Sequence, residues 1–534
     1  MIETILRKGY FPAELPPPFS TIMFSEAIKK NINSLPIEYD WSGQKKPNYI
    51  SRPLIFNLAR NGNLRRKLSI PNPVNSFQQA KVIAENWPEL EAHYNKSDKS
   101  LSSPKYNDSS LRAINWTKGF DVANLERLKV RASNRYILKT DISKFYPTIY
   151  THSIPWALHG KTTAKSKRGF DMLTGNKLDK VIQNGQDGQT KGVPIGPDAS
   201  YATAEIILTN IDQLITSRIG SNYFRYIDDY EFAFNTYSEA ERALAILSEI
   251  FNEYELDLSF EKTKILSLPQ LIEDTWVADL KSIEIGDSVK TQQQGLISLF
   301  NKAIDLQKNN NSKAVVKYAI QRTTHCEIKK ENWDLYQNIL YNFLVAESGV
   351  ISIIIDILKY YEDNDFVINR ELLKYAISKT ILEHAAKLHS SELSWAVWAC
   401  ICFKITLDSD ITKVLCRIHD PIVALVCLDA NNMGLLHSDF DTHVWENLMN
   451  AEELKGPFWI LTYEALFKKW LPSAGSGNYL DTQKEFKFLK DNNISFYNKQ
   501  KTSTYKGGLK LSGKRSSTLK ALINKLDREN GAYL

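Results

Sequence analysis

The chain has 534 residues, of which 43% are hydrophobic and 24% are charged. These fractions are ordinary for folded proteins and exclude a mainly disordered, collagen-like or low-complexity chain. The length predicts several domains, or two if one of them is a large enzyme core. The longest uninterrupted apolar run, residues 395–403, is less than half as long as a helix that crosses a bilayer, so we expect no membrane partner.

The five cysteines are odd in number and lack CxxC spacing. This usage argues against a disulfide scaffold and against a zinc site. His384 and His389 have no metal-site spacing with the cysteines, and we expect them on a helix surface. The first residues lack the apolar stretch of a secretory signal, so we expect a protein of the reducing cytoplasm.

The formal net charge of +6 is mild but unevenly distributed. Residues 481–534 carry twelve Lys and Arg against five Asp and Glu, which gives a net charge of +7. A second basic cluster, without any acid, lies between Lys45 and Lys67. Lys and Arg that neutralise phosphates release counterions, so two basic patches on a nearly neutral body suggest a polyanionic partner. The alternative for the tail is an ordinary solvated lysine face.

In chain order, the first half alternates between strand and helix patterns. Prolines make residues 1–60 irregular, residues 64–71 alternate like a strand, and residues 76–94 suit a helix. The predicted elements that follow are a β-prone run at 136–139, a glycine-rich loop region, a helix at 198–219, a hairpin at 223–234, a helix that ends near 254 and a strand at 256–260. Ser238 and Glu241 form the capping box expected to open the helix that ends near 254.

The order strand, helix, hairpin, helix, strand predicts an α+β fold with a split β-α-β-β-α-β, ferredoxin-like palm. Beyond residue 290, apolar residues recur at helical spacing and predict an all-α, HEAT-like repeat domain. The predicted helical segments are 293–307, 334–360, 367–388, 391–407, 411–428, 442–450 and 457–471. We place the mixed domain at 1–275, the helical domain at 276–485, and a basic tail that packs on or extends it at 486–534.

Three carboxylates carry the strongest chemical signal. Asp228 and Asp229 lie side by side at the tip of the predicted hairpin, and adjacent carboxylates are costly unless a cation neutralises them. Asp141 ends its own β-prone run, and a palm sheet pairs such a strand with the hairpin. We therefore expect Asp141, Asp228 and Asp229 to bind two Mg²⁺ or Mn²⁺ ions, the arrangement used for phosphoryl transfer.

Five segments, in the same order along the chain, resemble the motifs of reverse transcriptases. They are Arg65-Arg-Lys-Leu-Ser-Ile-Pro71 of the fingers, Asp141-Ile-Ser-Lys-Phe-Tyr146 of motif A, Gly192-Val-Pro-Ile-Gly-Pro197 of motif B, Tyr226-Ile-Asp-Asp229 of motif C and Phe260-Glu-Lys-Thr-Lys264 of motif D. The resemblance covers roughly residues 60–270. It implies that the mixed domain consists of reverse transcriptase fingers and palm.

The resemblance also implies roles for single residues. Arg66 and Lys67 match the fingers side chains that hold the incoming triphosphate, which suits a planar guanidinium and a point charge. Tyr146 matches the aromatic ring that crowds a 2′-hydroxyl and selects deoxynucleotides. Lys262 matches the lysine that protonates the pyrophosphate leaving group, although a plain surface lysine is an equal alternative. The residues expected to shape the loop at the nucleotide are Gly192, Pro194 and Gly196.

Two departures from the reverse transcriptase motifs, together with the helical second half, point to one subgroup of the family. Ile227 replaces a small Ala common in bacterial members, and Ile195 stands where many carry a Gln that contacts the template side. The segment Tyr10-Phe-Pro-Ala-Glu-Leu-Pro-Pro-Pro-Phe19, residues 150–160 and the helical second half resemble the abortive-infection (AbiK-type) phage-defence reverse transcriptases. That resemblance implies a bacterial, homo-oligomeric enzyme that makes DNA from dNTPs without a template and remains covalently attached to the single-stranded product. A phage-encoded trigger is a further implied partner.

The residues leave several points open. The priming residue is unknown. Tyr10, Tyr39 and Tyr49 are candidates, and the alternative is that they are ordinary packing residues. One alternative function is a templated RNA-directed DNA polymerase of retron or group II intron type. Another is a catalytically silent module that binds nucleic acid and senses phage. The intact Asp141, Tyr146, Asp228 and Asp229 argue against the silent module, because a scaffold needs none of them.

Overall fold

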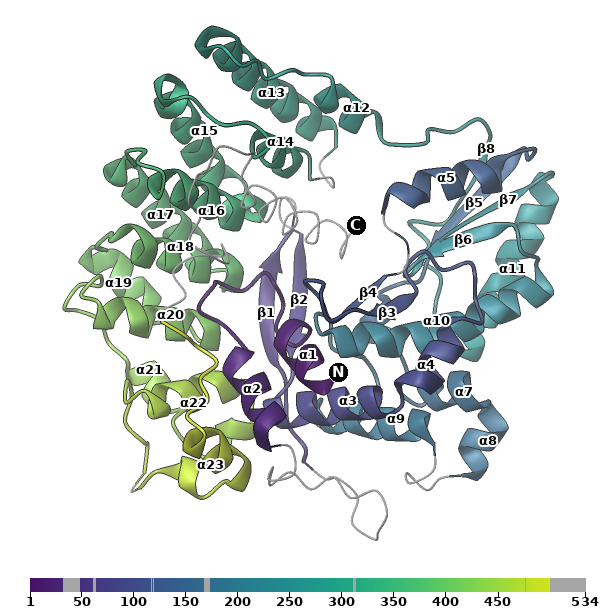
Figure 1. The fold of residues 1–534 in the computed structure, drawn as a ribbon, viewed down its shortest axis with the longest axis horizontal. Helices are drawn as coiled ribbons and strands as arrows, with labels where there is room; N and C mark the ends of the chain where they lie inside the picture. Colours follow the sequence, from purple (N-terminus) through teal and green to yellow (C-terminus); the bar gives the residue numbers. More distant parts are fainter. Residues whose placement is uncertain are drawn as a thin grey trace.

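The computed structural model of the protein describes residues 1–31, 49–60, 64–116, 118, 120–167, 173–310, 314–475 and 477–499. Tyr39 and residues 500–534 of the basic tail lie outside these ranges. A mixed α/β part and an all-helical part lie on opposite sides of a long β-hairpin (Figure 1). Within the described ranges, no helix has both the length and the apolar character needed to cross a membrane.

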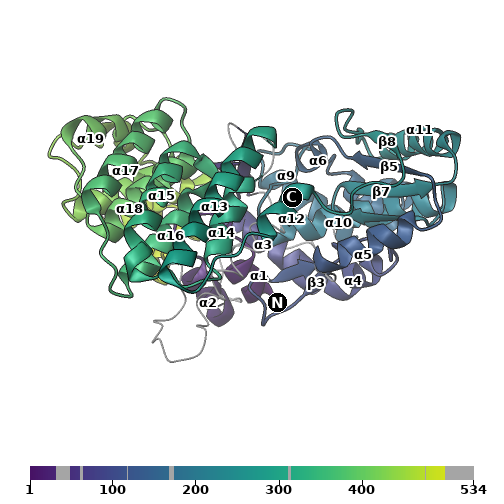
Figure 2. The same cartoon turned by 90° about the horizontal axis from the view of Figure 1, so that it is seen from above.

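Four antiparallel strands form the main sheet of the α/β part, in the order β6-β7-β5-β8. They are β5 (Tyr136–Asp141), β6 (Tyr223–Tyr226), β7 (Asp229–Phe234) and β8 (Lys264–Ser267). The sheet lies between α5 (Phe120–Arg131) and α11 (Tyr237–Glu253), as Figure 2 shows. Side chains alternate between these two faces, so Ile137 packs on the α5 side while Leu138 joins the main core.

The helix α10 (Asp198–Arg218) is buried along most of its length and connects the sheet to the rest of this part. The other elements of the α/β part are α1 (Ile2–Lys8), α2 (Ile22–Asn31), β1 (Leu54–Ala59), β2 (Arg65–Ile70), α3 (Pro73–Glu85), α4 (Trp87–Tyr94), β3 (Pro104–Tyr106), β4 (Ile114–Trp116), α6 (Phe145–Thr148), α7 (Ser153–His159), α8 (Lys161–Ser166) and α9 (Thr174–Asn184). Strands β1 and β2 pair as an antiparallel hairpin, which carries the residues that resemble the fingers motif.

Two local predictions in the palm are wrong. The capping box that opens α11 consists of Thr236 and Glu239, not Ser238 and Glu241: the Thr236 side chain accepts from the Glu239 amide, and the Glu239 carboxylate accepts from the Thr236 amide. The last strand is β8 rather than residues 256–260. In that segment Leu258 forms only an isolated bridge to Ile142, just beyond β5, whereas β8 pairs with residues 136–139 of β5.

The second half of the chain is helical. Its elements are α12 (Thr275–Lys281), α13 (Val289–Asn309), α14 (Val315–Thr323), η2 (Lys330–Asn332), α15 (Trp333–Ala346), η3 (Ser348–Val350), α16 (Ile351–Glu362), α17 (Arg370–Ala385), α18 (Ser390–Phe403), α19 (Ser409–Leu415), α20 (Pro421–Asn432), α21 (His443–Glu446), η4 (Glu453–Lys455), α22 (Trp459–Phe467), η5 (Tyr479–Asp481) and α23 (Lys484–Asp491). The predicted segment 411–428 is two helices, because Pro421 opens α20. Segment 334–360 is likewise divided into α15 and α16.

The helical half packs directly on the N-terminal segment and on the β1–β2 hairpin. Helix α18 lies against β1, and the indole of Trp395 donates to the carbonyl of Glu14 at 2.9 Å. The indole of Trp459 donates to the carbonyl of Ile70, the last residue of β2. Beyond α23, the amide of Ser20 donates to the carbonyl of Phe496 at 2.8 Å. The two halves therefore share one continuous hydrophobic core.

A fully buried ion-pair network fixes α10 to the sheet. Arg225 of β6 donates to Glu205 at 2.7 and 3.1 Å and to Asp212 at 2.7 Å, and all three side chains are at most 1% exposed. Arg225 also donates to the carbonyl of Ile227, in the turn that follows β6, at 3.0 Å. Removal of one partner from such a network leaves buried charge uncompensated.

We expect Arg225→Leu to lower stability by about 3–5 kcal/mol, because Glu205 and Asp212 would remain buried without their counterion. The control is Arg218→Leu, since Arg218 also pairs with two carboxylates, but those of Glu249 and Glu253 are more than half exposed. Its loss should cost about 0–1 kcal/mol. Urea denaturation followed by circular dichroism measures both, and equal costs would contradict the buried network.

Candidate active site

The sheet brings the three predicted carboxylates together. Asp141, the last residue of β5, is directly opposite Asp229, the first residue of β7, in the antiparallel register. Asp228 precedes β7 in the tight turn after β6, and its carbonyl accepts from the amide of Ile142 at 3.2 Å. One carboxylate oxygen from each of Asp141, Asp228 and Asp229 lies within 4.8 Å of the others. Both the motif C turn and the end of β5 are thus required to build the cluster.

The turn that presents Asp228 has an unfavourable backbone conformation. Ile227 has φ +52°, in the left-handed region that a β-branched residue rarely adopts. Its amide donates to the Ser102 hydroxyl at 2.8 Å, and its carbonyl accepts from buried Arg225. Residues far apart in the sequence therefore hold the conformation in place, as is common where strain serves a functional site.

Proximity raises the proton affinity of the carboxylates. Burial, followed by the charge of Asp141, raises the pKa of Asp228 to about 6, although Lys262 and Arg66 act in the opposite direction. Burial and the charges of Asp228 and Asp141 raise the pKa of Asp229 to about 8. Asp229 is the most exposed of the three, so we attribute more of its shift to the neighbouring carboxylates than to burial. The cluster carries negative charge that a cation would neutralise.

These residues fit divalent metal ions. Carboxylate oxygens are the ligands that Mg²⁺ and Mn²⁺ prefer, and three of them converge on one region. The ammonium of Lys262 already donates to Asp141 at 2.6 Å, while most of the side chain remains exposed. Although partial burial alone would lower it, the contact with Asp141 and the charges of the cluster raise the pKa of Lys262. A metal ion that binds Asp141 must therefore compete with this ammonium.

The consecutive basic residues of β2 point to opposite faces of the strand. Arg66 lies on the same strand face as the buried Leu68 and is close enough to the cluster to lower the pKa of Asp228. Successive side chains of a strand point to opposite faces, so Arg65 and Lys67 point the other way. Arg65 is bound to Glu392 of α18, and Lys67 is exposed. The structure brings Arg66 toward the carboxylates but not Lys67, whose contact with a triphosphate stays a prediction.

Tyr146 and the motif B loop lie side by side. Tyr146 is half-buried on α6, and its carbonyl accepts from the amide of Val193 at 2.9 Å. The loop then reaches the fingers, where the carbonyl of Ile195 accepts from the amide of Ser69 at 2.8 Å. Gly192 and Gly196 have φ +95° and +129°, which side chains other than glycine rarely tolerate. The loop, with Pro194 buried in it, thus bridges the palm and the hairpin.

Sequence patterns did not reveal the residues that position this loop. Asp198, next to motif B, is 1% exposed and accepts from the Arg112 guanidinium at 2.8 Å and from the amides of Ala113 and Ile114. Ser102, which holds the Ile227 amide, also lies outside the recognised motifs. The position of Asp198 at the start of a helix would suggest a helix cap. Its partner Arg112 lies 86 residues away, so no local sequence pattern links the two.

The two described candidate priming tyrosines are both inaccessible. Tyr10 is 2% exposed, and its hydroxyl donates to the carbonyl of Pro71 at 2.6 Å. The hydroxyl of Tyr49 is buried, and the ring lies under the ammonium of Lys455. Burial raises the pKa of both phenols, which opposes formation of a nucleophilic phenolate. Neither hydroxyl can reach a nucleotide in this conformation.

A sequence model described as reverse transcriptase (RNA-dependent DNA polymerase) matches residues 70–311. The chain therefore contains a reverse transcriptase domain, which belongs to the nucleotidyltransferase class of polymerases. Members of this family generally use divalent metal ions. The expected reverse transcriptase domain is confirmed, whereas the AbiK-type assignment is not. A search of curated proteins finds no match.

Solved structures give distant likenesses. Apo telomerase from Candida tropicalis is 13% identical, with a TM-score of 0.31, over 73% of this chain and 76% of that chain. A form truncated from the C-terminal domain is 13% identical, with a TM-score of 0.29, over 47% of this chain and 56% of that chain. Telomerase from Candida albicans, in complex with a TWJ fragment of telomeric RNA, is 11% identical, with a TM-score of 0.28, over 68% and 66%. Likenesses this distant carry no conclusion about substrate.

We expect Lys262→Met to tighten Mn²⁺ binding in the absence of nucleotide by about two- to fivefold. The variant removes an ammonium that competes for Asp141, and a largely exposed ion pair is worth up to about 1 kcal/mol. Isothermal titration calorimetry measures the change. Lys264→Met, which removes an exposed lysine on β8, is the control and should leave the affinity unchanged. Weaker binding in Lys262→Met would contradict the competition.

Proposed function

We propose that the protein is a DNA polymerase that transfers nucleotidyl groups from dNTPs to a hydroxyl group. The observation that carries this proposal is the convergence of Asp141, Asp228 and Asp229 at one edge of the sheet, with Arg66 near enough to act on Asp228. Two Mg²⁺ or Mn²⁺ ions held by these carboxylates would activate the attacking hydroxyl and stabilise the leaving oxygen.

Each neighbouring side chain then has a defined task. Arg66 orients the triphosphate through paired hydrogen bonds, which a planar guanidinium provides. The ring of Tyr146 excludes a 2′-hydroxyl from the sugar pocket. Lys262 is placed to give a proton to the pyrophosphate that leaves, because its ammonium already lies at the cluster. Gly192, Pro194 and Gly196 shape the loop on the primer side.

We further propose template-independent, protein-primed synthesis in abortive-infection defence, as in the AbiK-type enzymes that the sequence resembles. The product would be single-stranded DNA attached covalently to a homo-oligomeric bacterial protein that a phage component triggers. Ile195 supports the absence of a template, since its apolar side chain offers no hydrogen bond to a template base. Residues 1–275 would be fingers with a ferredoxin-like palm, for which the strand order β6-β7-β5-β8 is support. Residues 276–485 would be HEAT-like repeats followed by the tail at 486–534.

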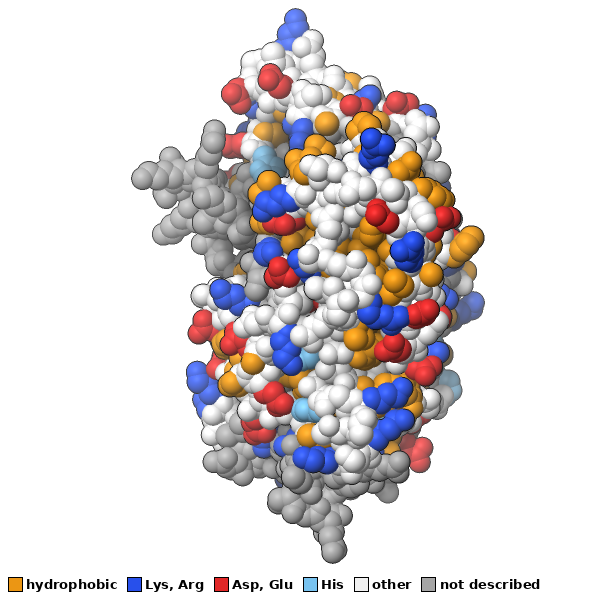
Figure 3. All heavy atoms as spheres, turned by 90° about the vertical axis from the view of Figure 1, so that its right-hand side faces the viewer, with side chains coloured by type: hydrophobic (Ala, Val, Ile, Leu, Met, Phe, Trp, Pro, Cys, Tyr) orange, Lys and Arg blue, Asp and Glu red, His pale blue; other side chains and the backbone are white. Residues whose placement is uncertain are grey.

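The outer face of the palm does not support a nucleic-acid path there. Figure 3 shows Lys and Arg interspersed with Asp and Glu on this side of the molecule rather than gathered into one stripe. The described part of the basic cluster between residues 45 and 67 instead lies on and before the β1–β2 hairpin. A nucleic acid would therefore approach from the hairpin side, next to the carboxylates.

The decisive measurement incubates purified protein with Mg²⁺ and labelled dNTPs, without template or primer. We expect label on the protein band of a denaturing gel and a shift of that band after protease treatment. Asp228→Asn should reduce incorporation by at least about a thousandfold, because a metal ligand is lost from the reacting centre. Asp257→Asn, outside the cluster, is the matched control and should keep wild-type activity.

Other outcomes would select another function. Incorporation only after an RNA template and primer are added would establish the templated alternative. If Asp228→Asn and Asp229→Asn variants still protect cells from phage, the protein acts as a silent sensor. If label stays on the protein, the attachment peptide identifies the priming residue.

We expect Tyr146→Ala to raise the use of ribonucleotides relative to deoxynucleotides by about ten- to a hundredfold. A steric contact with one hydroxyl group is worth about 1–3 kcal/mol of discrimination. Tyr146→Phe keeps the ring and should keep the selectivity. Competitive incorporation of rNTPs and dNTPs measures both variants, and equal selectivity in Tyr146→Ala and wild type would rule out the steric role.

A further inference from the structure

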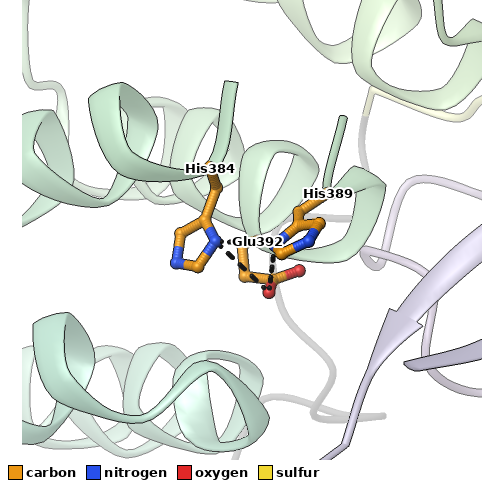
Figure 4. A group of neighbouring side chains, drawn as sticks. All are labelled: His384, His389 and Glu392. Atoms are coloured by element: carbon orange, nitrogen blue, oxygen red, sulfur yellow. Dashed lines mark hydrogen bonds and ion pairs between the residues drawn. The ribbon is translucent and has the colours of Figure 1, made fainter. Parts of the chain in front are cut away.

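A second group of metal-ligand side chains lies between α17 and α18, away from the carboxylate cluster. His384 is in the last turn of α17, His389 precedes α18 and Glu392 is in the first turn of α18 (Figure 4). His384 is 5% exposed and Glu392 is fully buried. The expectation that both histidines lie on a helix surface is therefore wrong for His384, because the tight α17–α18 connection turns its ring inward.

The three side chains direct one atom each toward a common point (Figure 4). The Nδ1 atoms of His384 and His389 are 2.8 Å apart. Glu392 Oε1 lies 3.6 Å from the first and 3.4 Å from the second. Tetrahedral zinc, with Zn–N and Zn–O distances of about 2.0–2.2 Å, separates its ligand atoms by about 3.3–3.6 Å. The two edges at Glu392 Oε1, 3.4 and 3.6 Å, match one face of such a tetrahedron, and the 2.8 Å edge between the Nδ1 atoms would have to lengthen by about 0.5 Å.

A hydrogen bond between the two histidines accounts for one edge of this triangle. Two neutral imidazoles that face each other through Nδ1 can share only one proton, so one hydrogen bond is the most they can form. The neutral ring is the form that binds a metal ion.

The surroundings match those of a metal ligand set. The second ring nitrogen of His384, Nε2, lies 3.5 Å from the Ser348 hydroxyl, and metal-bound histidines are usually oriented through their other nitrogen. Glu392 Oε2 accepts from the Ser391 hydroxyl at 2.6 Å and from Arg65 Nη2 at 2.8 Å. Oε1 is the oxygen nearer to the two histidine Nδ1 atoms, and it also accepts from Arg65 Nη1.

Arg65 limits the affinity of these three side chains for a cation. Its Nη1 also contacts Glu392 Oε1, so a bound cation must displace Nη1 while Nη2 stays on Oε2. Part of the carboxylate charge is already balanced by the guanidinium. We therefore expect binding weaker than that of zinc sites built from four protein ligands.

We propose that His384 Nδ1, His389 Nδ1 and Glu392 Oε1 form a zinc site, with water as the fourth ligand. The ion joins the end of α17 to the start of α18. Arg65 of β2 stays attached to Glu392 through Nη2 and Oε2 when the ion takes Oε1. The cysteine-based expectation of no zinc site does not apply to this group, which contains no cysteine.

The test is a Co²⁺ titration of the full chain in millimolar Mg²⁺, which keeps the carboxylate cluster occupied. We expect the visible absorption bands of tetrahedral Co²⁺ to saturate at one equivalent and to disappear when Zn²⁺ is added. His389→Gln should weaken Co²⁺ binding by at least about tenfold, since loss of a direct ligand exceeds the loss of a supporting contact. His443→Gln, on the exposed α21, should behave like wild type.

Two outcomes would overturn the proposal: wild-type protein that gives no tetrahedral Co²⁺ bands, or His389→Gln that binds as tightly as wild type. If His389→Gln does not fold by circular dichroism, His384→Gln and the wild-type spectrum decide the question. Nucleotide incorporation is not a readout of this test. A failure of the proposed polymerase function therefore leaves its result unchanged.

Discussion

The structure of the α/β half depends on holding three mutually repelling carboxylates close together. The register of β5 and β7 places Asp141 opposite Asp229, and the turn adds Asp228 to the same edge. In the free protein, proton binding reduces this repulsion, as the raised pKa values of Asp228 and Asp229 indicate. The ammonium of Lys262, which donates to Asp141, reduces it further. Divalent ions would neutralise the cluster more completely than either.

The rest of the palm holds this unfavourable arrangement in place. The left-handed backbone of Ile227 is held by Ser102, which accepts from its amide, and by Arg225, which donates to its carbonyl. Arg225 is in turn fixed by Glu205 and Asp212 of α10. A buried ion-pair network is weak evidence for stability, and in some proteins it instead specifies one geometry. In this protein the specified geometry is that of the turn bearing Asp228.

The sequence was most informative where a function depends on neighbouring residues. The Asp228–Asp229 pair and the motif that begins at Asp141 predicted the cluster, because their spacing is local and their chemistry is unusual. The bounds of β8 were wrong, since only the pairing with β5 decides which apolar run forms the strand. The cap of α11 was wrong because Thr236 and Glu239 fit the same capping pattern two residues earlier. Arg65 with Glu392, 327 residues apart, could not be predicted, because each residue alone resembles an ordinary surface charge.

That last pair connects the two halves of the molecule. Arg65 and Arg66 are consecutive residues of β2, so their side chains leave opposite faces of one strand. Arg65 is anchored by buried Glu392, the bond network extends to Asn57 of β1, and the Ala59 amide donates to Ser391. Arg66 lies toward the carboxylates. Because α18 holds the β1–β2 hairpin through these contacts, the position of Arg66 depends on α18 as well as on the α/β half. The helical half is therefore part of the structure that holds Arg66 in place.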